Sequence, residues 1–376
     1  MTLREKIADE IRRLGPIPFS RYMEMCLYDP QLGYYSRNDE QFGKAGDFYT
    51  SSDVHAVFGR LLSRQFEEMW RALDSPSRFD ILELGPGRGL FAQDVLDWSQ
   101  KKFPNFFDAI DYVLVESSPA LRTRLDQTLR DHVHAGKAEI VGEPPATFGN
   151  PTIVFANEFF DALPVKVLSS SGELKIDLSG GDVDGDCLVE KFATPCPEAL
   201  HFLDRYSVHP QPGERVEVAL AAQQYMENIA ARLKRGFVIA VDYGYTREEQ
   251  LAGRHLGTVT GYRKHGINTS VYDAPGEQDI TAHVNFTALQ AAAEKHGMKM
   301  MGLVTQAQFL MGIGEENQFA DAFEECRLPQ ERAKVALQLK HLVSPAGMGE
   351  SFHVLIMSKG LEKGSAGGLS GLKFAR

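Results

Sequence analysis

Two segments of this chain combine apolar runs with residues able to bind a nucleotide or hold a reacting group. The first, Phe79-Asp-Ile-Leu-Glu-Leu-Gly-Pro-Gly-Arg-Gly89, leads from an apolar run into three spaced glycines. The second, Thr152-Ile-Val-Phe-Ala-Asn-Glu-Phe-Phe-Asp-Ala-Leu-Pro164, ends an apolar run with an amide and two carboxylates. Glycines let a backbone turn sharply and approach a ligand, and carboxylates can orient a cationic group. These segments predict a nucleotide site and an acidic acceptor site.

The glycine segment predicts a buried strand, a tight turn and a helix, the unit that opens a nucleotide-binding α/β sheet. Gly85, Gly87 and Gly89 are spaced G-x-G-x-G, whereas a dinucleotide fingerprint needs G-x-G-x-x-G, and Leu90 occupies the last position. With Glu83 just before the turn, the segment is similar to the first motif of S-adenosylmethionine-dependent methyltransferases. A strand–helix turn without a ligand is the alternative.

A second acidic position supports adenosine binding. Residues 111–116, Asp-Tyr-Val-Leu-Val-Glu, predict the next strand, and Glu116 stands at its tip. A carboxylate in this place can accept hydrogen bonds from both ribose hydroxyls of an adenosine. The alternative is a solvated acid at a strand end.

The strand predicted at 152–156 ends in Asn157, Glu158 and, three residues later, Asp161. Ligands of a doubly wound sheet bind beyond the carboxyl ends of its strands, which is where these side chains are expected. Carboxylates there could clamp a planar guanidinium and offset its charge. A strand end with a simple turn is one alternative. Another is the Asn/Asp-Pro-Pro-Tyr/Phe motif of amino-methylating nucleic-acid enzymes, whose prolines are missing here.

A loop before the first core strand offers further candidates. Asp47 and Thr50 lie in a glycine-flanked loop expected to lead into a helix N-terminus, where hydroxyl and N–H groups could hold the carboxylate of a methionine moiety. Helix capping explains such residues equally well. Weaker candidates for the same crevice or for a base are Glu217, Asp242, Asp279 and His283.

Composition narrows the function classes. The formal charge is −11 with no long basic run, which argues against nucleic-acid binding, and 43% hydrophobic residues are enough for a sizeable core. The four cysteines show no metal-ligand spacing, so we expect no metal. No apolar run is long enough to span a membrane, and the first residues resemble neither a signal nor a transit peptide. These features predict a cytoplasmic protein.

The pattern along the chain predicts an α/β fold with a mostly parallel, doubly wound sheet. We expect an N-terminal extension over 1–78 that covers the site of the methyl donor, S-adenosylmethionine. A core over 79–358 should follow, with insertions at about 165–215 and 245–335, and then a flexible tail over 359–376. The expected strands are 79–84, 111–116, 138–141, 152–156, 237–244, 298–304 and 352–357. The expected helices of the core are 90–102, 119–131, 217–234, 286–296, 306–323 and 329–343.

The whole chain resembles the MidA-like family of S-adenosylmethionine-dependent methyltransferases of bacteria and mitochondria. The resemblance rests on blocks spread over nearly the entire sequence, and the Asn157–Pro164 block is the most specific of them. The blocks are Gly15-Pro-Ile, Tyr28-Asp-Pro-Gln-Leu-Gly-Tyr-Tyr35, Gly46-Asp-Phe-Tyr-Thr-Ser51, Leu84-Gly-Pro-Gly-Arg-Gly89, Asn157-Glu-Phe-Phe-Asp-Ala-Leu-Pro164, Val241-Asp-Tyr-Gly244, Pro275-Gly-Glu-Gln-Asp-Ile-Thr-Ala-His283, Gln308-Phe-Leu-Met-Gly-Ile313 and Pro345-Ala-Gly-Met-Gly-Glu350.

This resemblance implies a class I methyltransferase fold and S-adenosylmethionine as the cofactor. It implies a protein arginine methyltransferase, since the mitochondrial members act on arginine in respiratory complex I assembly, with a respiratory subunit as the partner. It carries over Gly85, Gly87, Gly89 and Glu116 to donor binding and Asn157, Glu158 and Asp161 to the active site. A non-catalytic assembly factor that binds the donor, a nucleic-acid methyltransferase and an oxidoreductase remain alternatives.

Overall fold

The structure is a computed structural model that describes residues 1–36, 56–179, 187–263, 266–268, 270–361 and 368–375. The chain forms two compact units. The first unit consists of Met1–Phe48, Phe160–Met226 and Gly244–Ala292, and the second of Tyr49–Phe159, Glu227–Tyr243 and Ala293–Arg376. The expected N-terminal extension therefore divides between the two, because residues 1–48 belong to the first unit and the helix at 56–72 to the second.

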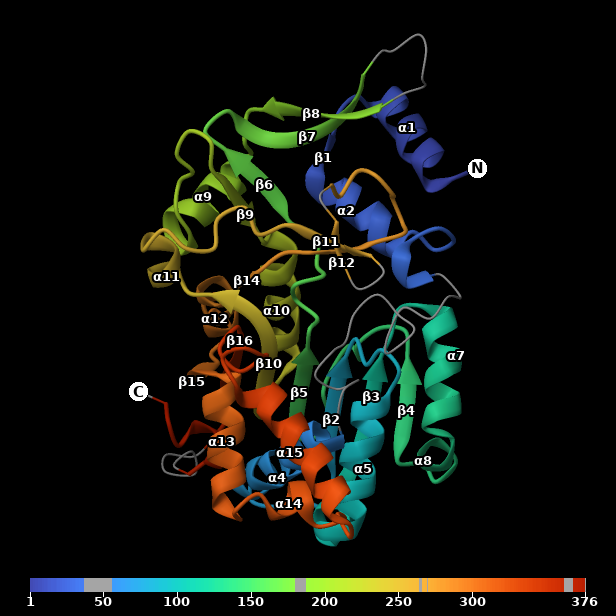
Figure 1. The fold of residues 1–376 in the computed structure, drawn as a ribbon, viewed down its shortest axis with the longest axis vertical. Coiled ribbons are helices and arrows are strands. Elements are labelled where there is room, and N and C mark those ends of the chain that lie inside the picture. Colours follow the sequence, from blue (N-terminus) through green and yellow to red (C-terminus); the bar gives the residue numbers. More distant parts are fainter. Residues whose placement is uncertain (37–55, 180–186, 264–265, 269, 362–367, 376) are drawn as a thin grey trace. The chain divides into compact units, whose positions relative to one another are not determined.

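The second unit is built on a sheet with the strand order β15-β16-β10-β5-β2-β3-β4 (Figure 1). The strands from β4 to β10 run parallel, and β16 is antiparallel to both of its neighbours. Their bounds are β2 (Phe79–Leu84), β3 (Ile110–Val115), β4 (Ala138–Val141), β5 (Thr152–Asn157), β10 (Gly236–Tyr245), β15 (Lys299–Thr305) and β16 (Phe352–Lys359). This arrangement confirms the predicted class I methyltransferase fold.

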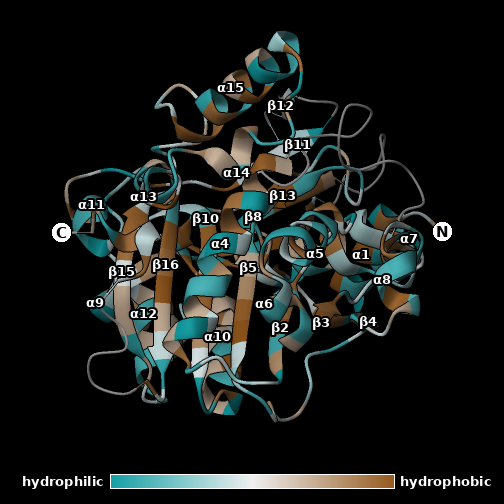
Figure 2. Ribbon diagram, turned by 90° about the horizontal axis from the view of Figure 1, so that it is seen from below, coloured by the Kyte–Doolittle hydropathy of each residue, from teal (hydrophilic) through white to brown (hydrophobic). Residues whose placement is uncertain are grey.

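Helices alternate with these strands. They are α4 (Ala56–Ala72), α5 (Leu90–Lys102), α6 (Pro104–Ala109), α7 (Pro119–Thr128), α8 (Arg130–His134), α10 (Leu220–Arg232), α12 (Phe286–Glu294), α13 (Gln306–Glu316), α14 (Ala320–Phe323) and α15 (Pro329–Val343). Strands covered on both faces must be apolar along most of their length, and Figure 2 shows β16 and β5 mostly brown.

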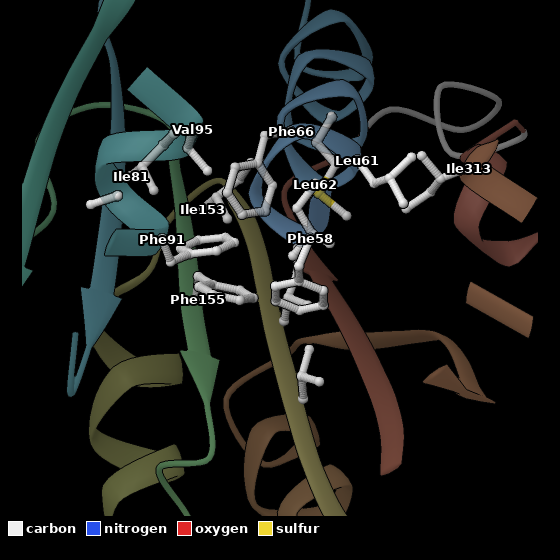
Figure 3. Packing of buried hydrophobic residues seen from close by; sticks show 14 of the residues in the cluster. Phe58, Leu61, Leu62, Phe66, Ile81, Phe91, Val95, Ile153, Phe155 and Ile313 are labelled. Carbon is white, nitrogen blue, oxygen red and sulfur yellow. The ribbon is translucent and has the colours of Figure 1, made fainter. Parts of the chain in front are cut away.

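The core of the second unit lies where α4 and α5 meet the sheet. Figure 3 shows aromatic rings from three elements in contact there. Phe91 of α5 stacks on Phe155 of β5 with ring centroids 4.5 Å apart, and Phe66 of α4 meets Phe155 edge-on at 5.6 Å. These contacts fix α5 against the sheet, and α5 is the helix that follows the glycine turn.

The first unit contains a larger and a smaller sheet, and the described strand pairs of both are antiparallel. The larger has the order β1-β7-β6-β9, with β8 paired to β7, and the smaller the order β12-β11-β13. Their bounds are β1 (Ile17–Pro18), β6 (Lys166–Ser169), β7 (Gly172–Ser179), β8 (Cys187–Ala193), β9 (Arg215–Val218), β11 (Thr260–Arg263), β12 (Gly266–Asn268) and β13 (Asp279–Thr281). A short strand, β14 (Val284–Asn285), continues parallel to the end of β10.

Short helices complete the first unit. They are α1 (Leu3–Leu14), α2 (Phe19–Tyr28), η1 (Tyr34–Ser36), α9 (Pro197–Tyr206) and α11 (Arg247–Leu251). No helix of the described residues is long and apolar enough to cross a membrane.

Several expected elements differ from the structure. The helix expected at 119–131 ends at Thr128, and a separate helix, α8, begins at Arg130. The helix expected at 217–234 begins only at Leu220, because Arg215–Val218 alternates like a strand and pairs antiparallel with β6. The helix expected at 306–323 is interrupted where Phe319 adopts a left-handed conformation (φ 58°). In the tail, for which flexibility was expected, Ser370–Leu372 forms a buried 3-10 turn, η2.

Candidate functional site

The glycine turn joins β2 to α5 through three left-handed residues. Gly85, Gly87 and Gly89 have φ values of 62°, 54° and 77°, which L side chains rarely adopt. The Gly85 N–H donates to the Val115 carbonyl at 3.1 Å and so ties the turn to the neighbouring strand β3. The conformation explains why the motif needs glycine at these positions.

Close packing adds a second reason for two of these glycines. A Cβ on Gly89 would lie 2.7 Å from Leu125 Cδ2 of α7, and one on Gly85 would lie 3.0 Å from Phe159 Cδ2. Gly89 is also the N-cap of the 13-residue helix α5, whose first N–H groups lack partners within the helix. A bare backbone turn at a helix start is suited to a polar or anionic ligand.

Glu83 lies inside the second unit rather than at the strand end. Its side chain is 4% exposed, and Tyr112 of β3 donates its hydroxyl to Glu83 Oε2 at 2.7 Å. Burial raises the pKa of Glu83 to about 7, although the Tyr112 hydrogen bond lowers it. The structure therefore gives Glu83 a partner within the protein.

Glu116 directly follows β3 at the same edge as the glycine turn. Its N–H donates to the Val141 carbonyl at 2.9 Å, and its Oε1 accepts from the Ser118 N–H at 2.8 Å. The guanidinium of Arg122 donates to the Glu116 carbonyl at 2.8 Å. Burial raises the pKa of the carboxyl to about 7, while the Ser118 hydrogen bond opposes this shift. These contacts fix the acid at the tip of its strand.

Asn157 and Glu158 end β5, the strand beside β2. Asn157 pairs with Val241 of β10, and the Glu158 N–H donates to the Val241 carbonyl at 2.9 Å. Asn157 Nδ2 donates to Glu158 Oε1 at 3.2 Å. Glu158 adopts a left-handed conformation with φ 50°, which costs a residue with a side chain on the order of 1–2 kcal/mol. Such strain is often retained at functional sites, where the geometry serves the chemistry.

Asp161 belongs to the first unit and is 4% exposed. Its carbonyl accepts from the Ala282 N–H at 3.0 Å. Burial raises the pKa of Tyr35 well above its usual range, and the charges of Asp279 and then Asp161 raise it further. Tyr35 donates its hydroxyl to Asp279 Oδ1 at 2.8 Å. Asp161 therefore lies in an acidic and aromatic part of the first unit, whereas Asn157 and Glu158 belong to the second.

The remaining candidates have different settings. Asp47 and Thr50 lie outside the described residues. Glu217 is part of β9, and its Oε1 accepts from the Thr258 N–H at 2.8 Å. Nδ1 of His283 lies 3.0 Å from Nδ1 of His255, and burial, followed by His255, lowers the pKa of His283 to about 4. His283 is therefore neutral near pH 7.

Asp242 lies near the end of β10 and is 1% exposed. Its Oδ1 accepts from the Tyr243 N–H at 3.0 Å. Among the residues described, no group of three or more histidine, cysteine, aspartate or glutamate side chains could hold a metal ion.

Three contacts were not predicted from the sequence. Tyr112 donates a hydrogen bond to Glu83, Tyr35 donates one to Asp279, and Phe159 packs on Gly85. An aromatic residue beside an acidic strand end gives no signal of its own, because buried phenylalanines and tyrosines are common in any core. For Phe159 the one indication in the sequence is its place in the Asn-Glu-Phe-Phe block, which was expected at the same end of the sheet.

The residues at this edge fit S-adenosylmethionine. The left-handed glycine turn leaves backbone free of side chains at the start of α5, and a buried acid is fixed at the tip of the next strand. These are the features needed for close contact with the donor and for accepting hydrogen bonds from its ribose hydroxyls.

Comparisons with known proteins agree with this geometry. Residues 61–304 match a family described as "Putative S-adenosyl-L-methionine-dependent methyltransferase". A mitochondrial protein arginine methyltransferase of Danio rerio, NDUFAF7, is 30% identical over 379 residues, which cover 93% of this chain and 85% of the relative. The Drosophila melanogaster homolog is 29% identical over 393 residues, covering 96% of this chain and 85% of the relative.

A solved structure is similar along the whole chain. A protein from Burkholderia thailandensis, described as a "likely methyl transferase" and crystallised with bound S-adenosyl-homocysteine, has a TM-score of 0.81 and 28% sequence identity. The match covers 99% of this chain and 95% of that one.

The expectation of a cytoplasmic location is wrong by these comparisons. The curated relatives of Drosophila melanogaster, Danio rerio and Homo sapiens are all named mitochondrial proteins. The prediction rested on the absence of a recognisable leader in the first residues, a weak criterion for location.

The family match spans more than half of the chain, and both the fold and the glycine turn agree with it. The chain belongs to this family of S-adenosyl-L-methionine-dependent methyltransferases, and S-adenosylmethionine is its cofactor.

Proposed function

We propose that this methyltransferase acts on arginine side chains of a protein. The support from relatives is that the matched curated proteins are named protein arginine methyltransferases. The observation that carries the proposal is the strained Glu158, fixed at the end of β5 by Val241 and Asn157. The next residue, Phe159, packs on Gly85 of the glycine turn. Glu158 therefore directly precedes a residue that contacts the glycine turn, which supports a role for its carboxylate near the donor.

Donor binding is assigned to the turn and to the acid of β3. Gly85, Gly87 and Gly89 would approach the donor through their backbone, and Glu116 would accept from its ribose hydroxyls. Glu83 supports the turn from within through Tyr112. When bound, S-adenosylmethionine supplies an electrophilic methyl group on a positively charged sulfur. Asp47 and Thr50 remain proposed contacts of its methionine part.

Glu158 would hold the acceptor guanidinium. A carboxylate matches the planar fork of N–H groups, offsets its charge and aligns one nitrogen for in-line attack. As the new N–C bond forms, the bond between the methyl carbon and the sulfonium sulfur breaks, which would leave S-adenosylhomocysteine. The nitrogen gives up a proton, and a carboxylate hydrogen-bonded to it can receive that proton. Asn157 would orient Glu158, as their hydrogen bond shows the two side chains in reach of each other.

Asp161 is proposed as a further acidic residue for the acceptor. It belongs to the first unit, so its role is tested by a variant of its own, Asp161→Asn. The acceptor protein is proposed to be a subunit of a respiratory complex, the class that the family resemblance implies.

The variant Glu158→Gln tests the assignment. Gln keeps the size and one acceptor oxygen but removes the charge and the second acceptor, so we expect loss of arginine methylation with S-adenosylhomocysteine binding unchanged. Transfer is measured as methylated arginine by mass spectrometry on proteins from cells that lack this gene, and binding by calorimetry. Glu139→Gln, an exposed glutamate on β4, is the matched control. An unchanged rate of transfer in Glu158→Gln would refute the role of Glu158.

The same assay separates the alternatives. An assembly factor that only binds the donor would form no S-adenosylhomocysteine when protein is added. A nucleic-acid methyltransferase would be stimulated by RNA or DNA rather than by protein. Turnover that depends on protein and yields methylated arginine supports the proposal against both.

A further inference from the structure

The C-terminal segment 368–375 is docked on the second unit, although composition predicts a flexible tail. The linker between β16 and this segment, residues 360–367, contains three glycines and one serine. Beyond it, η2 contacts α4, α13 and β15. Leu369 and Ser370 are each 7% exposed. A short segment on a glycine-rich linker that is nevertheless buried needs a specific seat.

Two side chains of α4 provide the polar part of this seat. Ser370 donates both its N–H and its hydroxyl to Glu68 Oε2, each at 2.9 Å. Gly371 donates its N–H to Gln65 Oε1 at 2.8 Å, and Gln65 Nε2 donates to the same Glu68 oxygen at 3.0 Å. One carboxylate oxygen thus collects three donors, two of them from the docked segment.

Glycines provide the steric part of the seat. A Cβ on Gly312 of α13 would lie 2.3 Å from the Ser370 carbonyl oxygen, and one on Gly302 of β15 would lie 2.7 Å from Leu372 Cδ2. On the side of the segment, a Cβ on Gly371 would lie 2.3 Å from the Phe309 ring. The contacts at Gly312 and Gly371 are with a backbone oxygen and an aromatic ring, so a side chain at either position would displace the segment, whereas at Gly302 the flexible end of Leu372 could shift.

We propose that this surface is a peptide-docking site for the chain's own C-terminal segment Leu369-Ser-Gly-Leu372, which acts as a releasable latch. The seat is defined by Gln65 and Glu68 of α4, Gly302 of β15, and Phe309 and Gly312 of α13. The latch joins α4 to α13. α4 in turn packs on α5 through Phe58 and Phe91, whose ring centroids are 5.7 Å apart.

The linker keeps the segment at a high local concentration, so docking in the same chain outcompetes a free peptide. The seat also selects its occupant. A hydroxyl at position 370 can donate to Glu68, whereas an acidic side chain there would meet the carboxylate with like charge. Docking is therefore expected to require an uncharged side chain that donates a hydrogen bond at position 370 and a glycine at position 371.

The test uses the full chain and a fluorescent peptide of residues 366–376. In Gly371→Val the chain's own segment cannot dock while the seat stays intact, so the peptide should bind roughly tenfold more tightly than to the wild type, where the linked segment competes. Fluorescence anisotropy measures binding. Gly149→Val is the matched control, because a Cβ on Gly149 meets nothing within 4 Å, and it should behave as the wild type does.

Two further measurements address the seat itself. A peptide carrying Ser370→Asp should bind Gly371→Val roughly tenfold more weakly than the wild-type peptide, since it loses a donor and adds a repelling charge. Hydrogen exchange of the Ser370 and Gly371 N–H groups should be slow in the wild type and fast in Ser370→Asp. Equal peptide binding by the wild type and Gly371→Val, or equal binding of both peptides, would overturn the proposal. An exchanged dimer on size-exclusion chromatography would overturn docking within one chain.

Discussion

The two units of this protein hold their polar groups in different ways. At the carboxyl ends of β2 and β5 in the second unit, the backbone adopts rare left-handed conformations. Positive φ values occur at Gly85, Gly87, Gly89 and Glu158. In the first unit, Asp279 is held by a side-chain pair with Tyr35, a residue far away in sequence, and the second unit has one such pair as well, Tyr112 with Glu83. A site built by the backbone leaves a readable motif, because only certain residues tolerate the conformation. A site built from paired side chains leaves none.

Burial shifts the pKa of titrating groups in both units, in a direction set by the kind of group: the pKa of Glu217 in the first unit is raised to about 7, as is that of Glu83 in the second. Burial raises the pKa of Glu83 in the second unit to about 7, and it lowers the pKa of His283 in the first unit to about 4. Both shifts favour the neutral form. Their effects on stability have opposite dependence on pH, because a carboxyl is neutral when protonated and a histidine when deprotonated.

The largest expected effect is at the glycine turn. In Gly85→Val the side chain would require a rare backbone conformation and would meet Phe159, so S-adenosylhomocysteine binding should be lost and the free energy of unfolding lowered by about 1–3 kcal/mol. Calorimetry and chemical denaturation measure the two effects. Gly149→Val, in open space, should show neither. If Gly85→Val bound S-adenosylhomocysteine as the wild type does, the glycine turn would not be part of the donor site.

The variant Glu83→Gln tests the buried acid of the second unit. The pKa of Glu83 rises from 4.5 to about 7 on folding, so the folded protein binds more protons between these values and wild-type stability falls as pH rises through that range. Gln does not titrate. The free energy of unfolding of the variant relative to the wild type should therefore increase from pH 4.5 to 7, by up to about 3 kcal/mol.

Chemical denaturation at a series of pH values measures this difference. Glu139→Gln on the exposed position of β4 is the control and should give a smaller change. A difference between Glu83→Gln and the wild type that stays constant with pH would show that Glu83 does not titrate with a raised pKa.

The variant His283→Asn should show the opposite dependence. The pKa of His283 falls from 6.5 to about 4 on folding, so its contribution to stability is present above pH 6.5 and is lost as pH falls toward 4. Relative to the wild type, the variant should gain up to about 3 kcal/mol as pH falls through that range. The same denaturation series measures it, with the exposed His201→Asn on α9 as the control. A gain as pH rises would contradict the prediction.

The smallest expected effects come from two tyrosines. Tyr112→Phe removes the donor to Glu83, and Tyr35→Phe removes the donor to Asp279, so each should lower the free energy of unfolding by about 1–2 kcal/mol. Tyr112→Phe should also raise the pKa of Glu83 further, since the lost hydrogen bond lowers it in the wild type. Denaturation of both single variants checks the values, and no loss in either would show that its carboxyl needs no tyrosine donor.

Much of the core sheet could be predicted from sequence. The strand at 79–84 and the helices at 90–102 and 329–343 have the expected bounds, because apolar runs between turn residues mark buried strands and helix periodicity marks the rest. Arg215–Val218 was missed because a short alternating run beside a helical pattern is ambiguous until a partner strand is known. The docked tail was missed because its seat comes from α4, α13 and β15, remote in sequence.

The candidate site was predictable in part. The glycine turn and the acid after β3 have local patterns, and the structure brings both to one edge of the sheet. The sequence grouped Asn157, Glu158 and Asp161 by proximity along the chain. The structure assigns Asp161 to a different unit, since the chain leaves the sheet directly after Glu158.

The sequence by itself determined the family, through motif blocks spread along the chain, and it determined the glycine turn and most strands and helices of the core sheet, because these depend on local conformational preferences and on apolar periodicity. Only the tertiary structure decided which acids are buried against a tyrosine, that Glu158 is held in a left-handed conformation by β10, and that the last residues are docked. The physical reason is that burial and hydrogen-bond partners come from residues distant along the chain, which only folding brings together.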